Sequence, residues 1–192
     1  MHAAGIETPV VLVGHSLGGF LARLYASTYP EDVFGLVVVD AYSELLEELT
    51  TPEKWLALVE LNRAQGTDTM VPIPGYGDLE TIGFGSDNAV MREALALHPL
   101  APMPLASLGH GIPLDVPHPP EGFTAESLEA LFSQANVGLA NLVPDGRYFV
   151  AKESGHYVHQ DQPALVIEAV RQVVTGVREP DTWYSMDSCC SS

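Results

Sequence analysis

Basic residues and cysteines are scarce in this sequence. Lys and Arg number 8 against 25 Asp and Glu, which makes the formal net charge −17 at pH 7. A chain this acidic repels phosphate backbones and anionic lipid headgroups, so we expect no nucleic-acid partner and no membrane docking. The two cysteines, Cys189 and Cys190, are adjacent, which disulfide geometry rarely permits, so they do not indicate a redox compartment.

Long apolar runs are missing as well, and none is long enough to span a bilayer. No basic segment followed by an apolar one opens the chain, as a secretory signal would. The cytoplasm is therefore favoured, although the sequence does not determine the compartment. His156 and His159 have the spacing of a metal-binding pair, but no third ligand is evident, so we expect neither a metal nor another cofactor.

Apolar, β-branched segments alternate with helical patterns along the chain, which is 46% hydrophobic. This alternation is typical of an α/β fold with a parallel sheet and right-handed crossovers, and we expect a single domain over residues 1–178. One helix is expected from Ser16 to Tyr29 and another over residues 163–175, with Gly176 as its stop. The predicted strands are residues 9–13, 34–39, 103–108 and 148–151.

Residues 44–99 interrupt this alternation. Thr51 can cap a helix that has Pro52 in its first turn, and a second helix is expected over about residues 87–97. Because the segment separates two core strands, we interpret it as a helical lid inserted above the sheet, with a long irregular crossover as the alternative. Residues 179–192 show no clear period and predict a disordered tail.

A nucleophile motif follows the first predicted strand, in Gly14-His15-Ser16-Leu17-Gly18-Gly19. The pattern G-x-S-x-G between a strand and a helix forms a strained turn that exposes the serine hydroxyl. Positions 14 and 18 are expected to require a small residue such as glycine, because larger side chains there would collide with neighbouring backbone. The amide of Leu17 is a candidate oxyanion donor. Ser16 is the candidate nucleophile, and a glycine-rich turn with a helix-capping serine is the alternative.

A serine nucleophile needs a base, and the sequence holds 7 histidines. His156 is the candidate, because it follows the last predicted strand and would stand at the carboxyl end of the sheet beside Ser16. His15 is expected to point away from Ser16 and to have a structural role. His110 and His118 lie near prolines in predicted loops and are expected to be solvated.

These segments resemble the α/β-hydrolase family. The run Pro-Val-Val-Leu-Val-Gly-His-Ser-Leu-Gly-Gly is similar to its nucleophile elbow, and Ser154-Gly155-His156 with a following Gln-Pro is similar to its histidine loop. The resemblance covers about residues 5–178 and implies the C-terminal half of that fold, with the four strands as its fifth to eighth. It also implies an N-terminally truncated chain, because residues 1–5 are typical of the last turn of a helix.

The acid of a Ser-His-acid triad is open between two aspartates. Asp40 follows the predicted strand that ends at Val39, where some members of the family carry their acid. Asp115 follows the next strand, where other members carry it, but it comes one residue later than their glycine-x-x-aspartate pattern expects. We favour Asp40, because the end of a strand is better fixed in space than a loop, and keep Asp115 as the alternative.

The resemblance implies a serine hydrolase of carboxylesterase type that forms an acyl-enzyme with small-molecule esters. An acyltransferase or a perhydrolase on the same fold is one alternative. The implied truncation would remove the loop that carries the second oxyanion donor and would bare the edge of the first strand. A catalytically impaired fragment that assembles with a partner or with itself through that edge is the second alternative.

Overall fold

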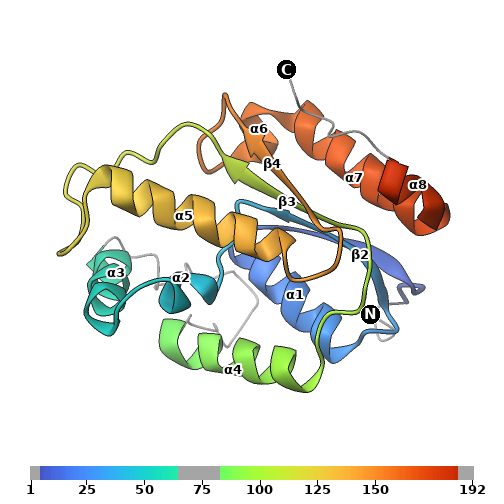
Figure 1. The fold of residues 1–192 in the computed structure, drawn as a ribbon, viewed down its shortest axis with the longest axis horizontal. Coiled ribbons are helices and arrows are strands. Elements are labelled where there is room, and N and C mark those ends of the chain that lie inside the picture. Colours follow the sequence, from blue (N-terminus) through green and yellow to red (C-terminus); the bar gives the residue numbers. More distant parts are fainter. Residues whose placement is uncertain (1–4, 65–82, 186–192) are drawn as a thin grey trace.

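The computed structural model describes residues 5–64 and 83–185. Within them, four parallel strands form one sheet whose spatial order follows the sequence. The strands are β1 (Val10–His15), β2 (Val33–Val39), β3 (Leu105–His110) and β4 (Arg147–Ala151). Parallel strands need crossover connections, and helices provide them on both faces of the sheet (Figure 1). The predicted α/β class with a parallel sheet flanked by helices is confirmed.

The side chains of β2 show how the two faces are covered. Val37 and Val39 pack against α7 (Pro163–Arg178) on one face of the sheet. Leu36 and Val38 point to the opposite face, where α1 (Leu17–Thr28) and α5 (Ala125–Ala140) lie. All four side chains are buried, as expected for a strand that is covered on both sides.

Strand β3 lies two residues further along the chain than predicted. The prediction began it at Met103, but Pro104 has no amide hydrogen to donate to a neighbouring strand, and the pairing with β2 begins at Leu105. The strand therefore extends to His110, which pairs with Ala151 of β4. A histidine that was expected in a loop is thus part of the sheet.

Helix α7 continues past Gly176, the residue predicted to stop it, because a further helix packs on that glycine. A Cβ at Gly176 would lie 3.0 Å from the ring of Trp183, which belongs to α8 (Pro180–Ser185). Trp183 is 3% exposed and joins the core cluster under α7. The predicted disorder is therefore wrong for residues 180–185, and residues 186–192 lie outside the described part of the chain.

Three helices follow β2 before the chain returns to the sheet. The amide of Lys54 donates to Thr51 Oγ1 at 3.4 Å, and Pro52 opens α3, as predicted. α4 begins at Phe84, three residues earlier than expected. The Asp87 side chain accepts a hydrogen bond from the Gly83 amide at 3.0 Å, which gives a partner to a backbone N–H group at the start of the helix. These helices are α2 (Leu45–Glu48), α3 (Pro52–Ala64) and α4 (Phe84–Leu97), and the intervening residues 65–82 lie outside the described part.

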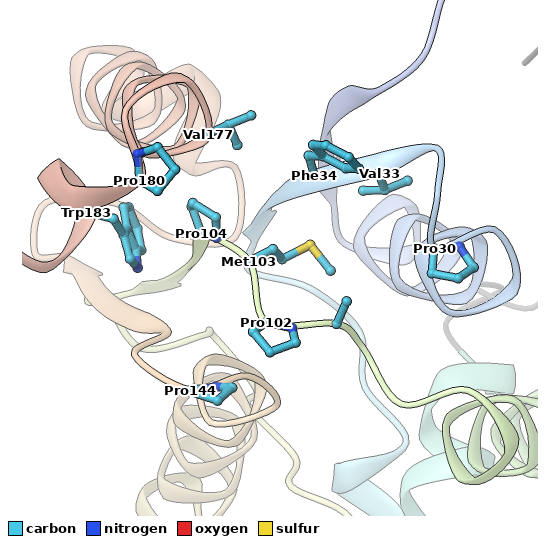
Figure 2. Close-up of a pocket in the computed structure, with 12 residues that line it drawn as sticks. Pro30, Val33, Phe34, Pro102, Met103, Pro104, Pro144, Val177, Pro180 and Trp183 are labelled. Atoms are coloured by element: carbon cyan, nitrogen blue, oxygen red, sulfur yellow. The ribbon is translucent and has the colours of Figure 1, made fainter.

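An apolar groove of about 310 Å³ lies where β2 and β3 begin. Figure 2 shows that Pro102, Met103 and Pro104 run between Phe34 on one side and Trp183 on the other. None of its described lining residues is titratable or nucleophilic. In a parallel sheet, sites form at the carboxyl ends of the strands, and this groove lies at the other end.

β1 is an edge strand of the described sheet, since β2 is its one partner there. Val13 in this strand is 49% exposed. Association of two copies through this edge stays a prediction. The helical turn predicted over residues 1–5 lies outside the described part of the chain, except for Gly5. Among residues 5–64 and 83–185, no helix has both the length and the apolar character to cross a membrane.

Candidate active site

Ser16 occupies a strained turn between β1 and α1. Its backbone angles are φ 54° and ψ −123°, a conformation that non-glycine residues rarely adopt. The Ser16 amide donates to the Val39 carbonyl at 3.0 Å, which ties the turn to the end of β2. A Cβ at Gly14 would lie 2.3 Å from the Gly18 carbonyl oxygen, so the turn requires glycine there, as predicted. The sequence motif thus has the strand-turn-helix context that its chemistry needs.

The second small residue that the turn requires is Gly19 and not Gly18. A Cβ at Gly18 would meet no atom within 4 Å, whereas one at Gly19 would lie 2.4 Å from Cβ of Ala41. The prediction for Gly18 was wrong because the first turn of α1 leaves that position open. Gly19 instead lets α1 pack closely against the segment that follows β2.

Asp40 and His156 meet at the carboxyl end of the sheet. Asp40 follows β2 directly, with φ 41°, and its Oδ2 accepts a hydrogen bond of 2.6 Å from His156 Nδ1. Asp115, the alternative acid, is exposed in the loop after β3. The structure therefore places Asp40 at the imidazole, although 116 positions separate the two residues in the sequence.

Ser16, Asp40 and His156 line one cavity of about 370 Å³. Leu17, the residue whose amide is the candidate oxyanion donor, lines it too. Trp55 and Phe84 bring apolar surface from α3 and α4, so the helices between β2 and β3 contribute to its wall, and their role as a lid stays a prediction. Other apolar lining residues are Ala41, Tyr42, Leu46, Leu58, Leu114 and Phe132.

His110 is a site residue that the sequence analysis misplaced. It was expected to be solvated, but it is 7% exposed and its Nδ1 donates to Asp40 Oδ1 at 2.7 Å. The Asn136 side chain, from α5, donates to the same oxygen at 3.3 Å. His110 is the last residue of β3, and Asp40 directly follows β2, so both lie at the carboxyl end of the sheet. A correct prediction of where β3 ends would therefore have placed His110 near Asp40.

The charges of this cluster shift two pKa values. Burial works to raise the pKa of Asp40, but hydrogen bonds from His110 and His156 outweigh it and lower the pKa to about 2. Burial likewise works to lower the pKa of His110, but the hydrogen bond and charge of Asp40, together with Glu129, outweigh it and raise the pKa. Asp40 is therefore ionised at neutral pH.

His15 supports the loop that carries His156. Its Nε2 donates to the backbone carbonyl of His156 at 2.8 Å, and the two rings lie 4.6 Å apart between centroids. Burial lowers the pKa of His15, so the ring is neutral at neutral pH. No group of three or more His, Cys, Asp or Glu side chains could hold a metal ion among residues 5–64 and 83–185.

A buried ion pair joins the helix after Ser16 to the segment after Asp40. Arg23 of α1 and Glu44 form two hydrogen bonds, of 2.9 and 2.6 Å, and their side chains are 0% and 2% exposed. Because Glu44 lies four residues beyond Asp40, the pair holds the serine turn and the aspartate in one rigid unit. Arg23 Nη2 also reaches the carbonyl of Tyr42 at 3.5 Å.

Loss of one partner of this pair is expected to destabilise the fold. Glu44→Gln should lower the free energy of unfolding by about 3 kcal/mol, because it leaves the Arg23 charge buried without its counter-charge. Glu168→Gln, which breaks the solvated Glu168–Arg171 pair, should change it by less than about 1 kcal/mol. Urea denaturation followed by circular dichroism measures both, and equal losses in the two variants would contradict the expectation.

The chain is similar to known proteins of one family. A family model described as the Alpha/beta hydrolase family matches residues 2–169. The (lyso)-N-acylphosphatidylethanolamine lipase of Mus musculus is 43% identical in an alignment 60 residues long that covers 29% of this chain and 17% of that protein. An AB hydrolase superfamily protein of Gibberella zeae is 25% identical in an alignment 221 residues long that covers 91% of this chain and 67% of that protein.

A solved structure has the same fold. The crystal structure of a candidate lipase from Acinetobacter baumannii AYE has a TM-score of 0.53 and 17% sequence identity, over 92% of this chain and 64% of that chain. At this identity the similarity shows the fold alone. The chain thus covers less than two thirds of the length of both the mouse lipase and the bacterial protein.

Proposed function

Because the chain belongs to the alpha/beta hydrolase family, we propose that it is a serine hydrolase that cleaves small carboxylic esters through an acyl-enzyme. One observation carries this proposal. Ser16 on its strained turn lines the same cavity as His156, and Asp40 holds the His156 ring by a hydrogen bond of 2.6 Å. Covalent labelling of Ser16 by a fluorophosphonate, together with turnover of nitrophenyl esters, tests it.

The proposed reaction begins when Ser16 Oγ attacks the carbonyl carbon of the ester. His156 takes the hydroxyl proton on Nε2, while Asp40 keeps Nδ1 as a donor and stabilises the imidazolium. The Leu17 amide, at the start of α1, donates to the oxyanion of the tetrahedral intermediate. The alcohol then leaves with the proton from His156, and the acyl group stays on Ser16.

The second half of the reaction repeats these steps with water. His156 removes a proton from the water, which attacks the acyl-enzyme, and Ser16 takes the proton back as the carboxylic acid leaves. An alcohol or hydrogen peroxide in place of water would give the acyltransferase or perhydrolase alternatives. These alternatives share the first half-reaction and differ in the product.

The cavity lining favours an uncharged substrate. The 8 Lys and Arg residues of the chain all lie within the described ranges, and none of them lines the cavity. A carboxylate or phosphate bound there would lose its hydration without gaining a Lys or Arg partner, and His110 in the lining is already paired with Asp40 and Glu129. The mouse relative is named for a phospholipid substrate, but no Lys or Arg side chain lines this cavity to bind a phosphate group. We therefore propose neutral esters with small apolar acyl groups as substrates.

Paired substrates of similar length test this preference. We expect kcat/KM for 4-nitrophenyl butyrate to exceed that for mono-4-nitrophenyl glutarate by at least about 10-fold, because an unpaired buried carboxylate costs more than the 1.4 kcal/mol that a factor of ten represents. The difference should be carried mainly by KM. Equal kcat/KM values for the two esters would contradict the proposed substrate class.

A further inference from the structure

The two oxygens of the Asp40 carboxylate have different partners. Oδ2 accepts the His156 Nδ1 hydrogen at 2.6 Å. Oδ1 accepts from His110 Nδ1 at 2.7 Å, from the His110 amide at 3.3 Å and from Asn136 Nδ2 at 3.3 Å. His110 therefore makes two of the three contacts to Oδ1. These contacts fix the rotation of the carboxylate and leave Oδ2 facing the imidazole that the proposed mechanism uses.

The His110 ring lies between two carboxylates. Its Nδ1 is 2.7 Å from Asp40 Oδ1, and its Nε2 is 2.9 Å from Glu129 Oε1 on α5. A neutral imidazole has one nitrogen without a hydrogen, and that lone pair would face a carboxylate oxygen on either side. The doubly protonated ring donates from Nδ1 to Asp40 and forms an ion pair with Glu129, although the Nε2 contact lacks hydrogen-bond geometry. A carboxylate on each side of the ring therefore favours the imidazolium form.

The charged groups next to the His110 cation are the two carboxylates, which balance its positive charge. Beyond Asp40 and Glu129, the His110 ring faces the uncharged Phe132 ring of α5, and the neutral Asn136 side chain shares the Asp40 oxygen with it. Tyr148 of β4 is neutral at pH 7, because burial raises its pKa. His156 lies on the far side of the Asp40 carboxylate. Glu129 therefore balances the charge of His110, and the negative charge of Asp40 stays available to His156.

We propose that His110 is a positioning residue, held as an imidazolium between Glu129 and Asp40, that fixes the Asp40 carboxylate with Oδ2 turned to His156. The inference rests on the proposed function, since it assigns His110 a role in orienting the catalytic base. It adds a second imidazole and a second carboxylate to the site, and neither touches the reacting atoms.

Two amide substitutions of His110 separate positioning from packing. The amide nitrogen of His110→Asn would stand near the place of Nδ1 and keep a donor to Asp40. The longer side chain of His110→Gln would place its amide near Nε2, toward Glu129, and lose that donor. We expect kcat to fall less than about 5-fold in His110→Asn and about 10- to 100-fold in His110→Gln, because misorientation of a catalytic group costs up to about 100-fold. KM should change by less than about 3-fold in both, and exposed His118→Asn serves as the control.

A packing role predicts the opposite order, since glutamine fills the space of the ring better than asparagine. Equal kcat values in the two variants, or a higher value in His110→Gln, would overturn the proposal. Circular dichroism shows whether each variant folds.

The charge of His110 can be measured in the unsubstituted protein, and the measurement needs no activity assay. Nitrogen-15 NMR of the histidine rings should show both His110 nitrogens protonated at pH 7.5, and Glu129→Gln should lower the pH at which the ring loses a proton. A neutral His110 ring at pH 7.5 would overturn the proposal even if both substituted proteins failed to fold. Failure of fluorophosphonate to label Ser16 would instead refute the proposed function, and the NMR result would still report the state of His110.

Discussion

Ser16→Ala is expected to abolish ester hydrolysis, with kcat lowered by at least about 1000-fold and no labelling by a fluorophosphonate. The substitution removes the hydroxyl that would form the acyl-enzyme. Tyr42, which also carries a hydroxyl at the cavity, donates it to Asn88 at 2.8 Å, and burial raises the pKa of Tyr42, so it is a poor substitute nucleophile. Steady-state kinetics and intact-mass spectrometry after labelling measure the two effects.

The Ser16→Ala protein should fold, because alanine keeps the Cβ and adds no strain to that of serine at the positive φ. The matched control is Ser133→Ala on the exposed surface of α5, for which we expect unchanged kcat and full labelling. Labelling of Ser16→Ala at the rate of the unsubstituted protein would show that another residue is the nucleophile. The enzymatic proposal would then fail, whereas the fold would be unaffected.

Asp40→Asn is expected to lower kcat by about 1000- to 10000-fold, the loss typical when an amide replaces the acid of such a triad. Asparagine keeps the size of the side chain, but it cannot stabilise the imidazolium that forms on His156 as a carboxylate does. It can also present an N–H to Nδ1 and so favour the wrong tautomer of the ring. KM should change little, since the acid does not bind the substrate.

Asp115→Asn is the matched comparison, because Asp115 is the other candidate acid and is exposed in its loop. We expect its kcat to stay within about 2-fold of the unsubstituted value, as is usual for surface substitutions away from a site. A large loss in Asp115→Asn with an active Asp40→Asn protein would reverse the assignment. Urea denaturation of Asp40→Asn accompanies the kinetics, because this variant also removes a partner of buried His110.

Much of the proposed site could be predicted from the sequence, because it depends on residues that are close together in the chain. The turn around Ser16 depends on a glycine two residues earlier and on a strand and a helix that adjoin it, all within a short stretch of sequence. His156 was found by its position after the last strand. The family assignment is shown by the match over residues 2–169, whereas the catalytic roles of Ser16, His156 and Asp40 stay predictions until the substitutions are made.

Other features depended on partners that are distant in the sequence. Gly176 looked like a helix stop because glycine often ends helices, but the buried Trp183 ring needs the space that a Cβ would fill. His110 looked like a loop residue because prolines lie near it. In the structure it contacts Asp40, 70 positions earlier, and Glu129 on a helix that follows.

The sequence by itself determined the order of the four strands and the strained turn at Ser16, since backbone preferences and apolar periodicity act over a few residues. The tertiary structure alone decided which aspartate meets His156 and which histidine meets that aspartate. Such choices depend on which strand ends lie side by side, and on hydrogen bonds between groups that only the packed helices and sheet bring within reach.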